Sequence, residues 1–424
     1  MGANEVAPIT ALSSGRAPLA AETAGALPPL PVSLYVHVPF CVSKCAYCDF
    51  YSIVDDPSLH ARYVDAALFE AGHWSHYDLL DDVPSVYFGG GTPTVLGGDL
   101  VRLVAGLRQT ARIREDAEIT VETNPEVTTP EIVAALTAAG ANRFSLGVQS
   151  FDDEVLRALG RCHDAAQIER ALQVLRDADV AFSIDLMCGI PGQSFESWDA
   201  TLEAAVASGA RHVSVYPLTV EPGTPLATAI GRGEVEPVDQ DRAADMMLAA
   251  EVALAAAGLP RYEVANYAQP GHEARHNLVY WTGGSYIGIG PHAASMLPAE
   301  VFELVAAAEG WALPGESGGG GRIRFTRETA VDDYLAHPLA LPEPMERLSV
   351  AEMAREDVML GLRLAEGVSA DFVRAAGVEP ALLELEAAGL VMRLGDDGGE
   401  DRWATTQTGW LLGNVVFRAV WERD

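Results

Sequence analysis

The chain has 424 residues, 49% of them hydrophobic, and a formal net charge of −32 at pH 7. The length favours one large domain with a smaller one beside it, and the hydrophobic content favours a packed globular protein. Such a negative surface repels phosphate groups, which argues against general nucleic-acid binding and against attraction to anionic membranes.

The first 31 residues are rich in Ala, Pro, Gly and Ser and are expected to form a disordered tail. They lack the basic start and the apolar core of a signal peptide. No run of about 18 apolar residues follows, so no transmembrane helix is predicted. The expected location is the cytoplasm, and peripheral contact with a membrane is left open.

Between residues 32 and 300, short β-branched runs alternate with longer amphipathic stretches. Strands are expected at 33–38, 85–90, 118–123, 143–148, 182–187 and 212–218, and helices at 58–72, 98–112, 130–140, 164–179 and 196–208. A shorter helix follows Asp152 and ends at Gly160. This alternation predicts parallel βαβ units, in an open doubly wound sheet or in a barrel. Because polar residues follow almost every strand, an arrangement typical of barrels, we expect a partial (β/α)6 barrel.

The sequence changes character beyond residue 300. Residues 301–345 are expected to form a connecting segment, with a glycine-rich loop at 314–321. Residues 346–424 predict a small domain in which "GLVMRLGDDGGEDRWATTQTG" forms a hairpin and "WLLGNVVFRAV" forms a closing helix. Helices followed by a hairpin are similar to a winged helix. With this acidity we expect an accessory cap rather than a DNA-binding domain.

Three of the five cysteines, Cys41, Cys45 and Cys48, lie within the stretch "CVSKCAYCDF". An odd number with three crowded together argues against a disulfide framework and fits a reduced compartment. A structural zinc ion takes four ligands, whereas Cys162 and Cys188 are far along the chain. A cubane iron–sulfur cluster held by three thiolates keeps one iron free for a small molecule. We favour the cluster over zinc completed by a distant ligand and over inert cysteines.

Other candidate residues follow the expected strands. In "YFGGGTPT", Gly90, Gly91 and Thr92 offer a backbone that a ligand can approach closely, or they form a tight turn. Later strands carry or are followed by four polar residues, Glu122, Gln149, Arg161 and Asp185. Glu122 could accept hydrogen bonds from a ribose diol, and Arg161 could pair with a carboxylate. Taken alone, each of these residues could equally be a solvated or paired structural group. The evidence for a binding site is the position that they share near strand ends.

Together these motifs resemble the radical S-adenosylmethionine (SAM) superfamily, in which Cys-x3-Cys-x2-Cys follows a first strand such as "YVHVPF". The stretches "GGGTPT", "RFSLGVQSF", "IDLMCGIPGQ" and "MLGLRLAEGV" narrow the resemblance. They are similar to the group of oxygen-independent coproporphyrinogen III oxidases and their relatives, the haem chaperones HemW. The resemblance covers about residues 33–300 and the C-terminal domain.

The resemblance implies a [4Fe-4S] cluster on Cys41, Cys45 and Cys48, with SAM bound to the free iron and an external electron donor. The implied SAM pocket consists of Tyr35, Tyr47, Gly90, Gly91, Thr92, Glu122, Gln149, Arg161, Asp185, Pro217 and Ile289. The cofactors would carry the chemistry, and the protein would position them. No residue is given a catalytic role.

Two features separate the relatives within this group. The oxidase usually has a fourth cysteine two residues after the third, where this chain has Phe50, and a longer segment before its first strand. The chaperone type has a His-Asn-x-x-Tyr-Trp motif, which matches "HNLVYW" from His276 to Trp281. Both features favour a haem chaperone that passes haem to an accepting protein.

The HNLVYW stretch allows two interpretations. If it is helical, His276 and Tyr280 share a face. The imidazole could then bind haem iron while Tyr280 and Trp281 pack against the ring, with Arg275 near a propionate. Alternatively, His276 is a structural histidine in an aromatic cluster.

Three functions are therefore carried forward. The first is a haem chaperone that binds a cluster, SAM and haem as cargo. The second is an oxidase that decarboxylates coproporphyrinogen III to protoporphyrinogen IX. The third is a zinc-stabilised binding protein without redox chemistry.

Overall fold

The computed structural model describes residues 30–314, 319–395 and 401–422. The expected disordered tail, apart from its last two residues, lies outside the described residues. So do the middle of the expected glycine-rich loop, at 315–318, and the turn of the C-terminal hairpin, at 396–400.

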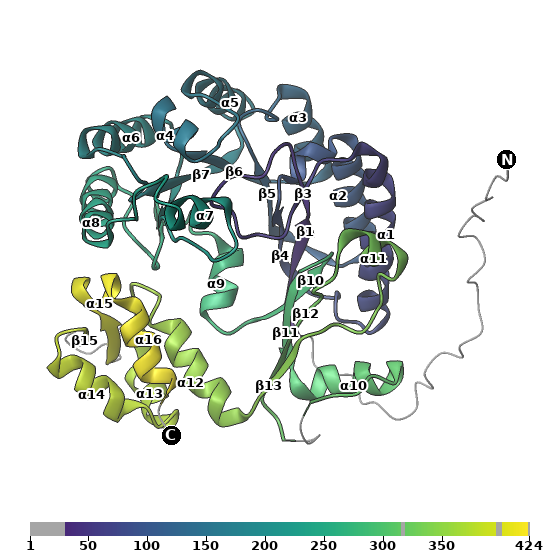
Figure 1. Ribbon diagram of the computed structural model, residues 1–424. Helices are drawn as coiled ribbons and strands as arrows, with labels where there is room; N and C mark the ends of the chain where they lie inside the picture. The colour runs from purple at the N-terminus through teal and green to yellow at the C-terminus, as the bar shows by residue number, and fades with distance from the viewer. Residues whose placement is uncertain (1–29, 315–318, 396–400, 423–424) are drawn as a thin grey trace.

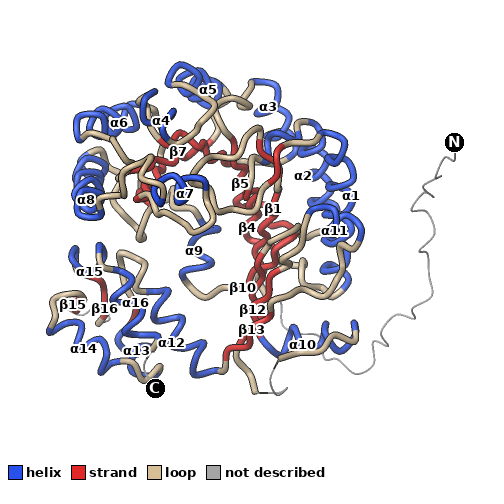
Figure 2. Tube along the Cα trace, viewed as in Figure 1, coloured by secondary structure: helices blue, strands red, loops and turns tan. Residues whose placement is uncertain are grey.

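The six predicted strands form the central part of one sheet. They run parallel in the order β1-β4-β5-β6-β7-β8. Their bounds are β1 Val32–Val38, β4 Val83–Gly90, β5 Ile113–Thr123, β6 Arg143–Gln149, β7 Ala181–Cys188 and β8 His212–Pro217. The helices between them are α1 Pro57–His76, α2 Gly98–Thr110, α3 Pro130–Ala139, α4 Asp153–Ala158, α5 Ala165–Asp177 and α6 Phe195–Ala207. Figures 1 and 2 show the strands as an inner arc with the helices outside it, which confirms the predicted partial barrel.

The helices begin at polar residues that cap their free backbone N–H groups. The Asp56 carboxylate accepts a hydrogen bond from the backbone of Ser58 at the start of α1. Asp164 and Gln167 cap each other reciprocally at the start of α5. Each such cap stabilises a helix by about 1 kcal/mol, which explains why helix starts could be read from the sequence.

The sheet extends beyond the six predicted strands to eleven. β10 (Ser285–Ile289) pairs in parallel with β1 and is followed by antiparallel β11 (Ala294–Pro298), β12 (Arg322–Thr326) and β13 (Met345–Leu348). At the other edge, β9 (Asn266–Ala268) pairs antiparallel with β8. The segment expected to be a connection, 301–345, therefore contributes to the same sheet and carries part of α10 (Ala299–Glu309) and all of α11 (Val331–Ala336).

Several short elements complete the barrel. They are β2 Phe40–Cys41, β3 Ile53–Val54, the 3-10 helix η1 Pro93–Leu96, and the helices α7 Pro225–Gly231, α8 Gln240–Ala256 and α9 Arg275–Trp281. No helix in the described part of the chain is long and apolar enough to cross a membrane.

The barrel strands have one apolar face and one polar face. Leu34 and Val36 of β1 are fully buried in the apolar core, where full burial of such a side chain contributes about 1.5–3 kcal/mol. Alternate positions on the neighbouring strands carry polar side chains such as Ser145, Asp185 and Ser214, which line a cavity. The core therefore lies between sheet and helices, while the inside of the barrel is polar.

The C-terminal domain has helices around a small antiparallel sheet in the order β14-β16-β15. Its elements are α12 Val350–Gly361, β14 Val368–Ser369, α13 Ala370–Ala375, α14 Glu379–Ala387, β15 Val391–Leu394, β16 Arg402–Thr405, α15 Gln407–Leu411 and α16 Gly413–Trp421. This agrees with the predicted helical domain and hairpin. It contacts the barrel through Trp410, whose Nε1 donates to the carbonyl of Val264 at 2.8 Å, and through Arg363, which lies over the ring of Trp281.

Candidate functional site

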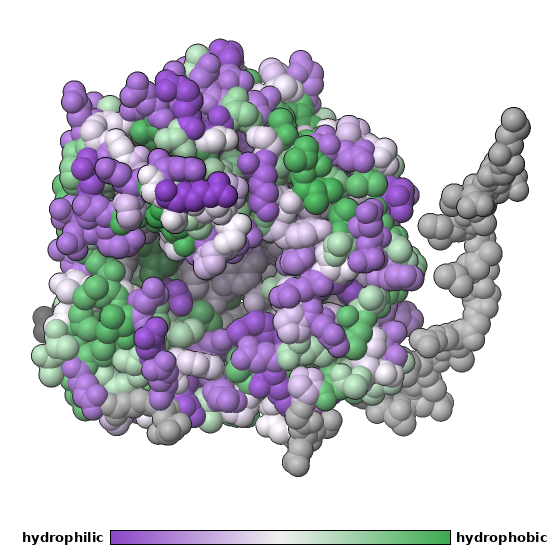
Figure 3. All heavy atoms as spheres, viewed as in Figure 1, coloured by the Kyte–Doolittle hydropathy of each residue, from purple (hydrophilic) through white to green (hydrophobic). Residues whose placement is uncertain are grey.

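A pocket of about 400 Å³ lies at the C-terminal ends of the parallel strands. Most of the predicted site residues line it, namely Cys41, Cys45, Tyr47, Cys48, Gly90, Gly91, Thr92, Glu122, Gln149, Arg161 and Asp185. Figure 3 shows that this face of the molecule is hollowed near its centre, in the region of α7 and α9. Residues that are scattered along the sequence are therefore gathered in one cavity.

The cysteine loop is closed at its base. Residues 40–41 pair with residues 53–54, and the backbone N–H of Asp55 donates to the carbonyl of Cys41 at 2.9 Å. His37, at the end of β1, holds the exit of the loop because its Nε2 donates to the carbonyl of Tyr51 at 2.8 Å. Burial lowers the pKa of His37 to about 4, so this imidazole is neutral at pH 7. The two ends of the loop are therefore held together, and its three cysteines line the pocket.

The three thiols are partly exposed on the pocket wall. Burial raises the pKa of Cys41 and of Cys48 above the usual thiol range. Two side chains from other elements donate to the sulfur atoms: the Thr92 hydroxyl to Cys41 at 3.9 Å and the Arg161 guanidinium to Cys45 at 3.4 Å. Among the residues that the structure describes, no three His, Cys, Asp or Glu side chains are grouped so as to hold a single metal ion.

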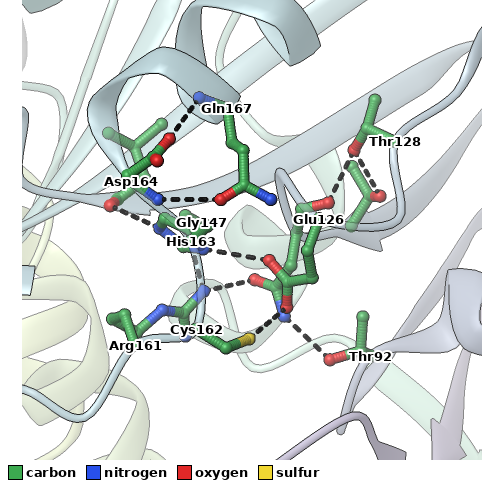
Figure 4. A network of polar contacts seen from close by, with 12 residues as sticks. Thr92, Glu126, Thr128, Gly147, Arg161, Cys162, His163, Asp164 and Gln167 are labelled. Carbon is green, nitrogen blue, oxygen red and sulfur yellow. Dashed lines mark hydrogen bonds and ion pairs between the residues drawn. The ribbon is translucent and has the colours of Figure 1, made fainter.

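Asn124 connects the two side chains that contact the cysteines. Its amide nitrogen donates to Thr92 Oγ1 at 2.8 Å, and its amide oxygen accepts from Arg161 Nη2 at 2.6 Å. Arg161 also donates to the carbonyl of Gly147 at 3.0 Å. A Cβ atom at Gly147 would lie 2.5 Å from the Asn124 oxygen, so glycine is required there. Figure 4 shows Thr92 and Arg161 within this network. Asn124, two residues after Glu122, was not among the residues predicted for the site.

A second network lies beside the first and includes Glu126, which also lines the pocket. The Glu126 carboxylate accepts from Cys162 at 3.3 Å and is hydrogen-bonded to His163 Nδ1 at 2.9 Å (Figure 4). Burial alone would raise the pKa of Glu126, but the hydrogen bonds from His163 and from its own backbone N–H, together with the charge of Arg161, outweigh burial and lower it. This pair fixes the segment that carries Arg161.

The glycine-rich loop after β4 is held by Glu122. The carboxylate accepts from the backbone N–H of Gly90 at 3.2 Å and from the Tyr87 hydroxyl at 2.7 Å. Burial raises the pKa of Glu122 to about 7. A Cβ atom at Gly91 would lie 2.5 Å from the carbonyl oxygen of Phe40, so only glycine lets this loop pack against the start of the cysteine loop.

The pocket floor is made by alternate residues of β5 to β8. Asp185 accepts from the Ser145 hydroxyl at 3.3 Å, and burial raises its pKa. Gln149 ends β6 with φ +67°, a backbone region that non-glycine residues rarely adopt and that is often found at binding sites. Three atoms of residues that line the pocket are buried without a hydrogen-bond partner among the described residues, Thr120 Oγ1, Arg161 Nε and His212 Nδ1.

Three predicted SAM residues do not line the pocket. Tyr35 lies behind it, with its hydroxyl 3.1 Å from His37 Nδ1 and its ring stacked on Tyr87. Ile289 is fully buried in β10, where it pairs with Val36 of β1. Pro217 is exposed at the end of β8. The contact of these three residues with SAM therefore stays a prediction.

The HNLVYW stretch forms α9, as the shared-face interpretation required. His276 is 1% exposed and both of its ring nitrogens are engaged. Because the Ser85 hydroxyl donates to Ser33, His276 Nδ1 donates to Ser85 at 2.9 Å and Nε2 accepts from Tyr280 at 2.9 Å. Burial lowers the pKa of His276 to about 3. This geometry supports the structural alternative, since neither nitrogen is offered to an iron atom.

The neighbours of His276 also have partners inside the protein. The guanidinium of Arg363 lies 5.2 Å from the centre of the Trp281 ring, which connects α9 to the C-terminal domain. Arg275 donates to the carbonyl of Asp116 at 2.5 Å. In α9 it is Asn277, not His276, that reaches the pocket wall.

Glu118 of β5 caps α9 from outside the helix. One carboxylate oxygen accepts from the backbone of His276 at 3.0 Å, and the other accepts from the backbone of Arg275 and from Arg143, both at 3.2 Å. The sequence analysis missed Glu118 and Arg143. The signal that could have found them is the alternation of polar residues along strands that were expected to be buried.

The comparisons with known proteins agree with this geometry. The family described as the radical SAM superfamily matches residues 35–205. The heme chaperone HemW of Mycobacterium tuberculosis is 34% identical over 417 residues, which cover 96% of this chain and 98% of that protein. The heme chaperone HemW of Escherichia coli is 40% identical over 267 residues, 62% of this chain and 69% of that protein. The solved structure of coproporphyrinogen III oxidase HemN from Escherichia coli has a TM-score of 0.74 at 23% identity and covers 93% of this chain and 91% of that one, which supports the fold.

Proposed function

Because this chain belongs to the radical SAM superfamily, and within it to the HemN-like group that includes HemW, we propose that it is a haem chaperone that binds haem and delivers it to haem-dependent proteins. The observation that carries the proposal is the gathering of three cysteines and the polar ends of five strands in one pocket. The names of the relatives support the choice of haem as cargo.

The donor set of the pocket fits the two cofactors that the superfamily implies. Cys41, Cys45 and Cys48 supply three soft ligands for a [4Fe-4S] cluster. The unpaired atoms Thr120 Oγ1 and Arg161 Nε fit a polar ligand such as SAM, since buried polar groups are normally paired. When bound, the cluster and SAM supply one-electron chemistry, which an external electron donor would start.

The residues of the chain then have positioning roles. Arg161 places a positive charge beside Cys45, where it offsets thiolate charge and can pair with the SAM carboxylate. Asn124 holds Arg161 and Thr92 in fixed orientations. We assign Tyr47, Gly90, Gly91, Glu122, Gln149 and Asp185 to the remaining wall of the SAM site.

The mouth of the pocket fits a flat apolar cargo. Phe50, at the position where the oxidase usually has a cysteine, is 66% exposed and lines the pocket. Val42 and Val54, also in the cysteine loop, are 46% and 65% exposed. Exposed hydrophobic side chains gathered in one loop are typical of binding surfaces. In this proposal His276, Tyr280 and Trp281 fix α9 and thereby place Asn277 in the pocket wall.

An anaerobic reconstitution tests the proposal. The protein is loaded with iron and sulfide, and haem or coproporphyrinogen III is then added in separate samples. A haem chaperone shows broad iron–sulfur absorption that dithionite bleaches, saturable haem binding, and no conversion of coproporphyrinogen. Conversion above the protein-free background would replace the chaperone by the oxidase. Failure to bind haem would reject the chaperone, and zinc in place of iron would support the non-redox alternative.

A further inference from the structure

A second cavity of about 460 Å³ lies at the opposite end of the barrel, at the N-terminal ends of the strands. Its wall includes the first residues of β7 and β8 and the first turn of α9. We call it the lower cavity. Arg143 and His212 line both the lower cavity and the cysteine pocket, so these two side chains form a partition between them. None of the roles assigned above uses the lower cavity.

Three arginines gather in the lower cavity of a strongly negative chain, together with Glu118 and Glu273. Arg143, Arg211 and Arg275 line it. Arg143 is paired with Glu118, and Arg275 is paired with Asp116. Arg211 is exposed, and among the described residues its side chain is hydrogen-bonded only to His272, at 3.4 Å from Nε2. Within the described residues it has no carboxylate partner.

The acidic residues of the lower cavity are already engaged. Glu118 accepts three hydrogen bonds, from Arg143 and from the backbone at the start of α9. Glu273 accepts from the backbone N–H of Gly271 at 2.9 Å. Arg211 therefore lacks a counter-ion, although the chain has a formal net charge of −32.

His212 adds a buried hydrogen-bond donor without a partner. It is 3% exposed, and its Nδ1 has no hydrogen-bond partner among the described residues. The Tyr262 hydroxyl lies 2.9 Å from His212 Nε2 and has no other hydrogen-bond acceptor among the described residues, so its proton goes to that nitrogen. The imidazole proton is then on Nδ1. Burial, with Arg143 nearby, lowers the pKa of His212 well below its usual value, which keeps the ring neutral.

The remaining residues of the wall indicate which kind of anion the lower cavity favours. Phe182 and Leu278 give the cavity an apolar side, which favours a ligand with a hydrocarbon body. An organic monocarboxylate has such a body, whereas inorganic phosphate has none.

We propose that the lower cavity binds an organic monocarboxylate, whose carboxylate pairs with Arg211 and accepts from the Arg143 and His212 side of the wall while its apolar body contacts Phe182 and Leu278. The planar fork of arginine suits a carboxylate, which it can bind through two parallel hydrogen bonds. This inference does not depend on the haem-chaperone proposal.

Isothermal titration of the full-length protein with benzoate tests the inference. Benzamide serves as the uncharged analogue and inorganic phosphate as the dianionic competitor. Saturable binding of benzoate is expected, with no detectable binding of benzamide. The Arg211→Gln variant should weaken benzoate binding about tenfold or more, because it removes a charged hydrogen-bond donor. The Arg418→Gln variant makes the same charge change on an exposed arginine of α16 and should bind like the wild type.

Each other outcome overturns the inference. No saturable binding of benzoate, or equal binding by Arg211→Gln, would show that the lower cavity is not a carboxylate site. Tighter binding of phosphate than of benzoate would replace the monocarboxylate by a phosphate-bearing ligand. Circular dichroism of Arg211→Gln separates loss of the site from loss of the fold, which is expected to be intact because Arg211 is exposed.

Discussion

The cysteine pocket and the α9 region are both polar, but they differ in how their polar atoms are paired. In the pocket, Thr120 Oγ1 and Arg161 Nε have no partner among the described residues, and three thiols are partly exposed. Around α9, both nitrogens of His276 and both oxygens of Glu118 are engaged inside the protein. A binding site keeps donors and acceptors for its ligand, whereas a structural cluster satisfies them internally.

The largest expected effect is the loss of the cluster from the pocket. The Cys45→Ser variant should hold almost no iron or acid-labile sulfide after anaerobic reconstitution, because a three-thiolate cluster loses one of its protein ligands. The matched control is Cys162→Ser, which changes an exposed cysteine of the same pocket and should reconstitute normally. Full loading of Cys45→Ser, or an empty Cys162→Ser, would contradict the assignment.

On the α9 side, the largest expected effect is on stability. Glu118→Gln leaves Arg143 without its buried carboxylate and turns an amide N–H toward the backbone donors of α9. We expect a loss of about 3 kcal/mol in the free energy of unfolding, measured with urea. The control Glu273→Gln removes a carboxylate that accepts one exposed backbone N–H, and it should change stability by less than about 0.5 kcal/mol. Similar effects of the two variants would show that Glu118 does not anchor α9.

A pH series sharpens the comparison further. Burial lowers the pKa of His276 from 6.5 to about 3, so below pH 6.5 the unfolded chain binds a proton that the folded chain excludes. The stability contribution is thus complete above pH 6.5 and falls as the pH drops toward 3. Between pH 6.5 and 5.5 the wild type should lose about 1 kcal/mol more than His276→Asn. His337→Asn, at an exposed histidine, should follow the wild type. Equal pH profiles for His276→Asn and the wild type would show that His276 titrates freely.

The smallest expected effect is the loss of the link between Thr92 and Arg161. Asn124→Ala removes two hydrogen bonds but no cluster ligand. SAM affinity of the reconstituted protein should fall about fivefold while the iron content stays unchanged. Asn414→Ala on the exposed side of α16 is the control. A loss of iron in Asn124→Ala would mean that the network holds the cluster rather than SAM.

Much of the barrel could be predicted because its signals are local. Hydrophobic periodicity, helix caps and turn residues were enough to predict where the six central strands and the helices between them lie in the sequence. The strands β10 to β13 could not be predicted in this way, since β10 pairs with β1 across nearly the whole barrel sequence. Short strands of this kind are fixed by their distant partners rather than by local propensity.

The site residues likewise include some that could be predicted from the sequence and some that could not. The cysteine spacing and the strand-end position were enough to predict most of the pocket wall. Tyr35 and Ile289 do not line the pocket, because a resemblance transfers a residue type without showing which way its side chain points. His276 illustrates the limit most clearly: the motif allowed a helix with two possible roles for His276, and the choice between them depends on Ser85 and Glu118 from other strands.

Electron paramagnetic resonance of the reduced, reconstituted protein with and without SAM tests the central claim most directly. If three cysteines hold the cluster and leave one iron open, SAM binds that iron and changes the g-values of the signal. A cluster spectrum that is identical with and without saturating SAM would contradict the account.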